Sequence, residues 1–370
     1  MTTAPPLPHP GPLQLDGTAA ELTAALVDVP SVSGDEAQLT DLIEQALTGL
    51  PGLSVWRRGN VVGARTELGR SQRVVLAGHL DTVPLAGNLP SRVEGTRLYG
   101  CGSSDMKAGD AVALRAAYEI GAGRLNPFVD VSWLFYDCEE IDASRNGLNA
   151  LAQQHPEELQ GDLAILLEPT NGALEGGCQG TMRALIRTSG VRAHSARSWL
   201  GRNAIHAAAP VLTRLAEHEP RVIDVDGLSF REGLNAVAIS GGVAGNIIPD
   251  ECVVTVNFRF APDRSEADAA AYLEDLFAGW PVEVVDSAPA ARPRLNGALA
   301  QSFARAVGGE ATAKFGWTDV SRFSALGIPA VNFGPGDPGL AHKPEEHVEL
   351  AKIADAEAVL LRFLAGAQAP

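Results

Sequence analysis

Short, largely apolar runs recur in the first and last thirds of the chain. Four of them are typical of buried strands: Val74–Ala77, Val129–Tyr136, Leu163–Leu167 and Ala330–Phe333. Because these runs have little polar alternation, they predict a sheet that is covered on both faces. Helical spacing appears between them, at Ala108–Glu119 and from about Leu148 onward. The pattern therefore predicts an α/β fold with a mostly parallel sheet.

The middle of the chain alternates between apolar and polar residues instead. Strands and helices are expected there in the following order: a strand at Thr181–Ser189, a helix at Asn203–Glu217, strands at Asn235–Gly242 and Cys252–Phe260, a helix capped by Ser265, and a strand at Val282–Val285. This order, β-α-β-β-α-β, is that of a ferredoxin-like unit. We therefore expect residues 180–292 to form an inserted α+β domain, and residues 1–179 and 293–370 to form the larger domain.

Polar residues with metal-binding side chains follow several of the predicted strands directly. His79 and Asp81 come after the first strand, and Glu168 comes after the third. In open α/β sheets, ligands bind beyond the carboxyl ends of the strands. We therefore expect these groups to meet in one crevice. The acidic run after the second strand and the glycine-rich loop before the first long helix extend the set, with Glu139, Glu140 and Asp105.

Together with a histidine near the C-terminus, these residues provide two imidazoles and four carboxylates: His79, Asp105, Glu139, Glu140, Glu168 and His342. Each alone is more typical of a solvated loop, but the combination predicts a metal site. Imidazole and carboxylate ligands suit zinc, cobalt or manganese better than calcium or an iron–sulfur cluster. A pair of divalent cations would also relieve repulsion among the carboxylates. We expect Asp81 to accept the other ring N–H of His79 and so fix its tautomer.

Composition and charge exclude several other functions. With 29 Lys and Arg residues against 45 Asp and Glu residues, the formal net charge is −16, which argues against nucleic-acid binding. The opening ten residues lack the basic start and apolar run of a secretory signal, and no apolar stretch is long enough to span a membrane. The four cysteines contain no C-x-x-C pair, so they predict neither a disulfide framework nor a thiolate zinc site. We expect a cytoplasmic protein with neither a nucleic-acid nor a membrane partner.

Five motifs resemble those of the zinc amidohydrolases, a family that includes acetylornithine deacetylase, aminoacylase, glutamate carboxypeptidase and succinyl-diaminopimelate desuccinylase. The motifs are G-H-L-D-T-V-P, G-C-G-S-S-D-M-K-A-G, D-C-E-E, L-L-E-P-T and A-H-K-P-E-E-H, and they occur in the family's order between about residues 75 and 350. The resemblance implies a zinc-peptidase-like catalytic domain and an inserted ferredoxin-like domain that serves as lid and dimerisation domain. It also implies two Zn²⁺ per chain, for which Co²⁺ can substitute.

Matching the motifs assigns a role to each ligand: His79 and Glu168 would bind one zinc, Glu140 and His342 the other, and Asp105 both. Glu139 would then be the general base, with Asp81 as a supporting catalytic residue. The resemblance adds His194 as a catalytic residue of the inserted domain. In the family this histidine is supplied by the partner subunit, so a homodimer is implied.

Within the family, segments such as Glu175–Met182, Arg192–Asn203 and Phe315–Asp319 are most similar to desuccinylases of the actinobacterial type. The substrate implied is N-succinyl-LL-2,6-diaminoheptanedioate. Gly316–Arg322 departs from the G-T-S-D-G-R-type segment of other desuccinylases. Other N-acyl amino acid hydrolases, such as acetylornithine deacetylases, and dipeptidases therefore stay open as alternatives. A metal-loaded binding scaffold is the non-enzyme alternative, although a scaffold has no need of a base such as Glu139.

The implied substrate carries three carboxylates, so its binding requires cationic side chains. Arg259 lies on the polar face of a predicted strand, and its planar guanidinium suits bidentate binding of a carboxylate. The further candidates for substrate binding are Asn246, Arg183, Thr318, Arg322 and Asn332.

Overall fold

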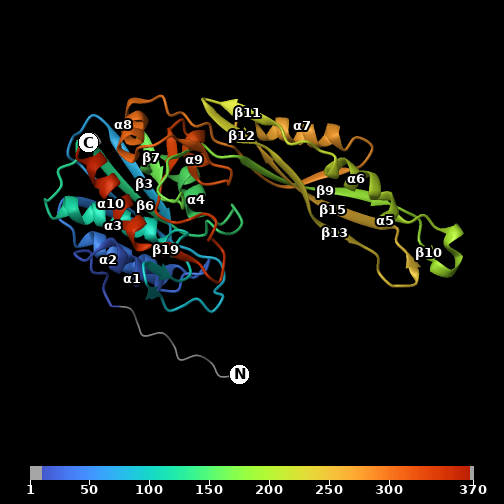
Figure 1. Ribbon diagram of the computed structural model, residues 1–370, viewed down its shortest axis with the longest axis horizontal. Helices are drawn as coiled ribbons and strands as arrows, with labels where there is room; N and C mark the ends of the chain where they lie inside the picture. The colour runs from blue at the N-terminus through green and yellow to red at the C-terminus, as the bar shows by residue number, and fades with distance from the viewer. Residues whose placement is uncertain (1–10, 367–370) are drawn as a thin grey trace, which may run out of the picture. The chain divides into compact units, whose positions relative to one another are not determined.

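The computed structural model describes residues 11–366 and divides the chain into two compact units, both visible in Figure 1. The first comprises Met1–Gly176, Arg294–Thr312 and Arg322–Pro370, and the second Gly177–Pro293 and Ala313–Ser321. The opening ten residues, where we expect no secretory signal, lie outside the described residues. No helix within residues 11–366 is long and apolar enough to cross a membrane.

The segment Ala313–Ser321 belongs to the second unit, whereas the sequence analysis assigned it to the larger domain. It makes hydrogen bonds to other residues of that unit. The backbone N–H of Gln179 donates to the carbonyl of Lys314 over 3.3 Å, and the indole N–H of Trp317 donates to the carbonyl of Pro289 over 3.1 Å.

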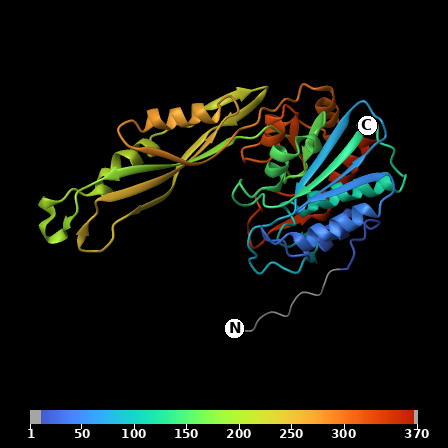
Figure 2. The ribbon, with the colours of Figure 1, turned by 180° about the vertical axis from the view of Figure 1, so that it is seen from behind.

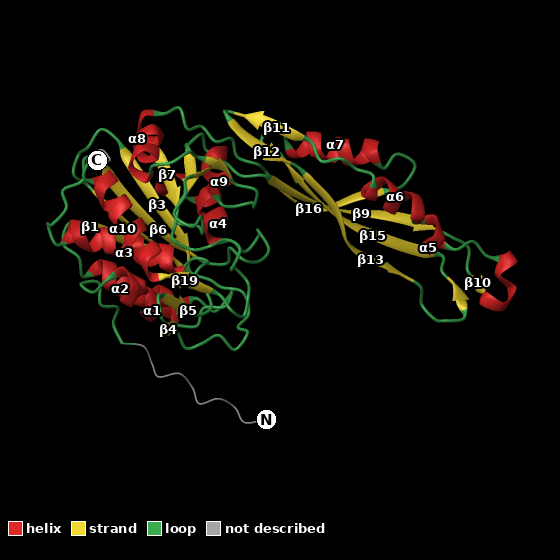
Figure 3. Ribbon diagram, viewed as in Figure 1, coloured by secondary structure: helices red, strands yellow, loops and turns green. Residues whose placement is uncertain are grey.

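The first unit is built on a mixed sheet of eight strands in the order β1-β2-β6-β3-β7-β18-β8-β17, drawn in yellow in Figure 3. The strands are β1 (Leu53–Arg58), β2 (Val61–Thr66), β3 (Arg73–His79), β6 (Asp130–Tyr136), β7 (Leu163–Leu166), β8 (Glu175–Gly176), β17 (Thr312–Ala313) and β18 (Ala330–Asn332). The four central strands, β6, β3, β7 and β18, run parallel. The prediction of a mostly parallel central sheet is confirmed.

Helices pack on the sheet of the first unit. One group comprises α1 (Ala19–Val27), α2 (Ala37–Thr48), α3 (Lys107–Gly121), α8 (Ala298–Val307) and α10 (Leu350–Leu364). This group shares one apolar core with the sheet, in which the Phe303 ring packs on Phe333 and Phe363 with centroids 5.2 and 5.0 Å away. Helix α4 (Gly147–Gln154) lies on the other side of the strands from α1–α3, as Figure 2 shows from behind. Both faces of the strands are buried, as the apolar runs predict.

The close approach of α3 to the end of β7 depends on Gly109. A Cβ at this position would stand only 2.1 Å from the carbonyl oxygen of Leu167, so any side chain would push the helix away. The N-terminal end of α3, which follows Asp105, therefore lies beside the residue that precedes Glu168. A small sheet of β4 (Arg92–Glu94), β5 (Arg97–Tyr99) and β19 (His347–Glu349) completes the first unit.

The second unit is a four-stranded antiparallel sheet in the order β13-β15-β9-β16. Its main elements are β9 (Gly180–Ser189), α5 (Ala204–Ala207), α6 (Ala209–Ala216), β13 (Gly233–Gly241), β15 (Glu251–Phe260), α7 (Glu266–Leu276) and β16 (Val282–Ala288). If β9, β13, β15 and β16 are numbered 1 to 4 in chain order, their order across the sheet is 2-3-1-4. The ferredoxin-like prediction is confirmed. The sequence did not reveal the added pairs β10 (Ala193–His194) with β14 (Ile247–Ile248) and β11 (Val222–Val225) with β12 (Leu228–Arg231).

Local sequence explains both a success and an error among the helices of this unit. The predicted cap of α7 is present as a capping box, because the Ser265 hydroxyl accepts from the backbone N–H of Asp268 and the Asp268 carboxylate accepts from that of Ser265. The single helix expected over Asn203–Glu217 is wrong: the structure has two helices that meet at Ala208. Pro210 has no N–H to continue the helical ladder at that point.

Candidate metal centre and active site

The parallel strands of the first unit have their carboxyl ends at one edge of the sheet, so the residues that follow them lie at this edge. Strand β3 ends at His79, which is paired in register with Tyr136 at the end of β6. The acidic turn 137–140 follows β6, and Glu168 follows β7. The loop before α3 adds Asp105. His342, with a φ of +64°, comes from the segment that precedes β19.

Two groups of possible metal ligands form at this edge, and they share Asp105. One consists of His79, Asp105 and Glu168, the other of Asp105, Glu140 and His342, and within each group the ligand atoms lie within 4.8 Å of one another. The Oδ1 atom of Asp105 is 3.2 Å from Nε2 of His79, and its Oδ2 is 3.6 Å from Nε2 of His342. The two oxygens of one carboxylate therefore face different imidazoles, which is the geometry a bridging ligand needs.

Glu139 and Glu140 occupy different positions in this arrangement. Glu140 Oε1 is 2.8 Å from His342 Nε2, within the second group. Glu139 forms a group with His79 and Glu140 but belongs to neither of the groups that contain Asp105. The structure thus brings together all five residues that the sequence proposed as metal ligands, with Glu139 beside them.

The charge at this edge is strongly negative, and the two imidazoles respond to it. Burial lowers the pKa of His79, but its hydrogen bond to Asp105 and the charges of Glu139 and Asp81 outweigh burial and hold this pKa well above its usual value. The hydrogen bond to Glu140 raises the pKa of His342 to about 9. Two imidazoles among four close carboxylates are a donor set that fits divalent metal ions.

The carboxylate of Asp81 anchors the acidic turn rather than the imidazole. Nδ1 of His79 lies 3.0 Å from the backbone carbonyl oxygen of Asp81 and 3.6 Å from its carboxylate. That carboxylate, fully buried, accepts the backbone N–H groups of Glu139 (2.9 Å) and Glu140 (3.0 Å) and the hydroxyl of Ser33 (2.7 Å). The His79 ring therefore lies within hydrogen-bond distance of the main-chain oxygen of Asp81, rather than of the carboxylate that we expected to accept its N–H.

A second buried carboxylate, that of Glu36, binds the backbone N–H of the residue just before Glu139. Its Oε1 accepts the backbone N–H groups of Gly34 (2.7 Å) and Cys138 (3.2 Å). Three consecutive N–H groups, at 138–140, are therefore bound by carboxylates. Glu36, Asp137 and Cys138 also have the spacing of a metal site. Burial, however, raises the pKa of the Cys138 thiol to about 12, so it is not a thiolate at neutral pH in the metal-free chain.

Sequence reasoning missed a third such carboxylate, that of Glu346. It is buried and accepts the backbone N–H groups of Gly102 (3.0 Å), Ser104 (2.8 Å) and Asp105 (3.0 Å). Burial raises the pKa of Glu346 to about 7 against the opposing effect of these three bonds. The one sequence feature that could have pointed to Glu346 is its position four residues after His342, inside the motif A-H-K-P-E-E-H.

His194 and Asn246 lie together in the second unit, on the short pair of β10 and β14. His194 is paired with Ile247, and the backbone carbonyl of Asn246 accepts from the N–H of Ser195 over 2.9 Å. The exposed ring of His194 accepts the backbone N–H of Ala196 at Nδ1 over 3.0 Å. A neutral ring must then carry its proton on Nε2, which becomes a hydrogen-bond donor that points away from the backbone.

The arginines proposed for substrate binding differ in their partners. Arg183 pairs with Asp286 over 2.9 Å, with both side chains exposed, and Nη1 of Arg322 donates to Asn149 over 2.8 Å. Arg259, on β15, is half-buried and, within residues 11–366, has no hydrogen-bond or ion-pair partner; burial lowers the pKa of its guanidinium. Thr318 in the second unit and Asn332 in the first are both buried.

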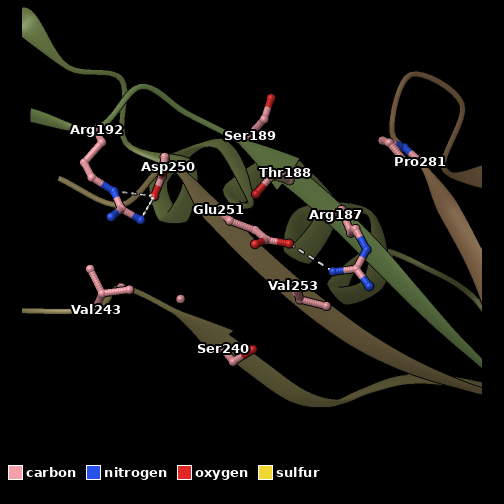
Figure 4. Close-up of a pocket in the computed structure, with 12 residues that line it drawn as sticks. Arg187, Thr188, Ser189, Arg192, Ser240, Val243, Asp250, Glu251, Val253 and Pro281 are labelled. Carbon is pink, nitrogen blue, oxygen red and sulfur yellow. Dashed lines mark hydrogen bonds and ion pairs between the residues drawn. The ribbon is translucent and has the colours of Figure 1, made fainter.

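A separate hollow of about 730 Å³ lies over the sheet of the second unit, and Figure 4 shows its lining. Its two arginines are both neutralised by acids of the same wall. Arg192 pairs with Asp250 over 2.8 Å and Arg187 with Glu251 over 3.0 Å. No unpaired charge among these lining residues points to a ligand, so this hollow does not compete with the metal-ligand edge as the candidate site.

Comparison with known proteins identifies the family. The model of peptidase family M20/M25/M40 matches residues 75–366. The chain belongs to this family. The resemblance seen in the five motifs is confirmed, and so is the expected class, a hydrolase of the M20 family.

Two curated relatives and one solved structure illustrate the likeness. The chain is 53% identical over 357 residues to a putative succinyl-diaminopimelate desuccinylase of Mycobacterium tuberculosis, covering 96% of this chain and 100% of the relative. It is 47% identical over 362 residues to a succinyl-diaminopimelate desuccinylase of Corynebacterium glutamicum, covering 95% and 97%. A tripeptidase from Staphylococcus aureus shares the M20 fold, with a TM-score of 0.78 at 22% identity, over 96% of this chain and 99% of that one.

The link between Glu140 and His342 predicts a pH dependence in the metal-free protein. We expect the His342 ring to titrate at about pH 9 and to fall toward its ordinary value of 6.5 in Glu140→Gln. Because the pKa is raised by folding, the charged pair stabilises the metal-free fold fully below the unfolded value, and this contribution is lost as pH rises through the folded value. NMR titration of the imidazole resonance, assigned by its loss in His342→Gln, measures the shift. A wild-type midpoint equal to that of Glu140→Gln would contradict the link.

Proposed function

We propose that this M20-family chain is a succinyl-diaminopimelate desuccinylase, which hydrolyses N-succinyl-LL-2,6-diaminoheptanedioate to succinate and LL-diaminopimelate. The observation that carries the proposal is the identity of 53% and 47% to relatives of that name over nearly the full length of each chain. The metal-ligand edge supports the same chemistry, since both ligand groups and Glu139 are present. We also propose a cytoplasmic location, in keeping with an enzyme of amino-acid biosynthesis.

Two Zn²⁺ ions are the proposed cofactors, although Co²⁺ has similar ligand preferences. His79 and Glu168 would hold one ion, Glu140 and His342 the other, and Asp105 would contact both through its two oxygens. Bound divalent ions of this kind lower the pKa of a water molecule and polarise an amide carbonyl.

Glu139 is the proposed general base and acid. It would take the proton of the attacking water and deliver it to the amine nitrogen as the amide bond breaks. Its backbone N–H is held by the Asp81 carboxylate over 2.9 Å, so its own carboxylate need not anchor the turn. The proposed catalytic contribution of Asp81 is this support.

Recognition of the anionic substrate is proposed to rest on groups of both units. Arg259 is the strongest cationic candidate, because its half-buried guanidinium has no partner among residues 11–366 and can donate to a substrate carboxylate without first breaking an ion pair there. Asn246 adds a polar side chain beside the His194 loop. Thr318 and Asn332 would donate or accept hydrogen bonds. Arg183 and Arg322 are weaker candidates, because protein groups already bind them.

A homodimer through the second unit, residues 180–292, is the proposed assembly, with this unit acting as lid. His194 is proposed to stabilise the negative charge that develops on the substrate carbonyl oxygen. Its Nε2–H, left free by the bond that Nδ1 accepts, is the donor that this role requires. The proposed donor acts in the active site of the partner chain.

The proposed function is tested with a panel of substrates on one metal-loaded preparation. N-succinyl-LL-2,6-diaminoheptanedioate should be hydrolysed with a kcat/KM at least about tenfold above that for N-acetylornithine or dipeptides, because only this substrate offers both the succinyl group and the extra carboxylates. Exhaustive chelation should abolish the activity, and added Zn²⁺ should restore it. A preference for an acetyl substrate or a dipeptide would replace this assignment with another within the family.

The division of roles between the adjacent glutamates predicts different losses. Glu139→Ala should lower kcat by several orders of magnitude while the bound zinc stays near two equivalents per chain, because only a proton carrier is removed. Glu140→Ala should lose about one equivalent of zinc, because a ligand is removed. Elemental analysis beside steady-state kinetics measures both. Equal zinc loss in the two variants would show that the roles are wrongly divided.

Action of His194 across the subunit boundary predicts complementation between two inactive chains. Mixing Glu139→Ala with His194→Ala and allowing subunits to exchange should create heterodimers with one complete site of two, and so about half the wild-type rate per heterodimer. If His194 instead serves its own chain, every site lacks one group and the mixture stays inactive. A fully active monomer in sedimentation would also contradict the proposal.

A further inference from the structure

The carboxylate of Glu346 makes its hydrogen bonds to the loop that carries Asp105. Only 2% of the residue is exposed, and within residues 11–366 no Lys, Arg or His forms an ion pair with it. Oε1 accepts from the N–H groups of Ser104 and Asp105, and Oε2 accepts from that of Gly102, over 2.8–3.0 Å. The buried carboxyl group thus receives its hydrogen bonds from three backbone dipoles that point toward it.

The same residue belongs to the segment that carries His342. Its N–H donates to the carbonyl of Lys343 over 3.1 Å, which closes the turn after His342. Its carbonyl accepts the N–H of Gly100 over 3.1 Å, and the next residue begins β19, which pairs with β5. Glu346 therefore binds the Asp105 loop through both its main chain and its side chain.

The second ligand group can form only if the side chains of Asp105 and His342 lie close together. Oδ2 of Asp105 and Nε2 of His342 are 3.6 Å apart, and both contribute to the group completed by Glu140. The N–H of Asp105 itself is one of the three that Glu346 holds. A shift of this loop would move the one carboxylate that both ligand groups share.

We propose that Glu346 is a positioning residue of the metal centre, which fixes the Asp105 loop against the His342 segment so that one carboxylate can serve two metal ions. The proposal rests on the proposed function only in taking these groups to be metal ligands. It assigns to Glu346 the role toward Asp105 that Asp81 has toward the turn at 138–140. Outer groups that orient metal ligands change metal affinity by about 10- to 100-fold when they are replaced.

The test compares Glu346→Gln with the matched control Glu345→Gln. Both replace a carboxyl group by an amide at neighbouring positions, but Glu345 is exposed and its carboxylate makes no hydrogen bond or ion pair within residues 11–366. The amide of Glu346→Gln places an NH₂ group against backbone N–H donors, so at least one of the three bonds is lost. Calorimetric titration of the metal-free proteins with Zn²⁺ measures a dissociation constant for each of the two ions. The dissociation constant of the more weakly bound ion should rise about 10- to 100-fold in Glu346→Gln and should not change in Glu345→Gln.

Two further readouts separate positioning from a general loss of structure. The visible absorption of the Co²⁺-loaded protein should change in band position or intensity in Glu346→Gln, because the ligand geometry changes, and should match wild type in Glu345→Gln. Glu346→Asp keeps the charge and should recover part of the affinity. Far-ultraviolet circular dichroism of all the variants should match the wild type.

Several outcomes overturn the proposal. They are an unchanged metal affinity in Glu346→Gln, an equal loss in Glu345→Gln, or loss of the fold in both Glu346→Gln and Glu346→Asp. The last outcome would make the residue a requirement for folding rather than for ligand placement. Metal titration needs no substrate, so this result is independent of the substrate panel. A wild type that binds two ions but cleaves no succinyl substrate would reject the proposed function and leave the role of Glu346 standing.

Discussion

The candidate site depends on buried carboxylates that bind backbone N–H groups. Asp81 and Glu36 hold the turn at 138–140, and Glu346 holds the loop at 102–105. Hydrogen bonds from N–H to an ionised carboxylate are roughly twice as strong as those between neutral groups. The parallel strands bring the loops to one edge, and these three residues determine the position of each loop at that edge.

These buried carboxylates add negative charge near the candidate metal ligands. Two carboxylate charges that lie within 4.8 Å of each other repel by at least roughly 3 kcal/mol at an effective dielectric constant of about 20. The raised pKa values of His79 and His342 are the response of the metal-free chain, in which protons on the imidazoles offset part of that charge. Metal binding must displace those protons, so the affinity for metal is coupled to pH.

The sequence predicted the elements that leave a periodic or compositional mark. The buried strands follow from apolar runs, the ferredoxin-like order from alternation in β15 (Glu251–Phe260) and its neighbours, and the ligand edge from the residues that follow each strand. The nearer contact of Asp81 with the His79 ring is made by its main-chain oxygen, which we did not predict, because His-x-Asp spacing brings the residue close without showing which of its oxygens meets the ring. Glu346 was missed because an acceptor for backbone N–H groups has no sequence pattern of its own. Ala313–Ser321 was misplaced because hydrogen bonds to main-chain carbonyls, such as those between this segment and Gln179 or Pro289, leave no pattern in the sequence.

Arg259 differs from three arginines of the second unit that form ion pairs, in a way that bears on the proposed substrate binding. Arg187, Arg192 and Arg221 each form ion pairs with nearby acids, which is the usual state of a guanidinium on this acidic protein. Arg259 is half-buried, its guanidinium pKa is lowered by burial, and it has no ion-pair partner within residues 11–366. Burial of a charge without a partner is unfavourable, and the cost is expected where a ligand supplies the missing anion. Under the proposed function, the unpaired guanidinium would bind a carboxylate of the substrate, whereas the ligand edge of the first unit would serve any amide. On this view the chemistry and the choice of substrate reside in different units of the chain.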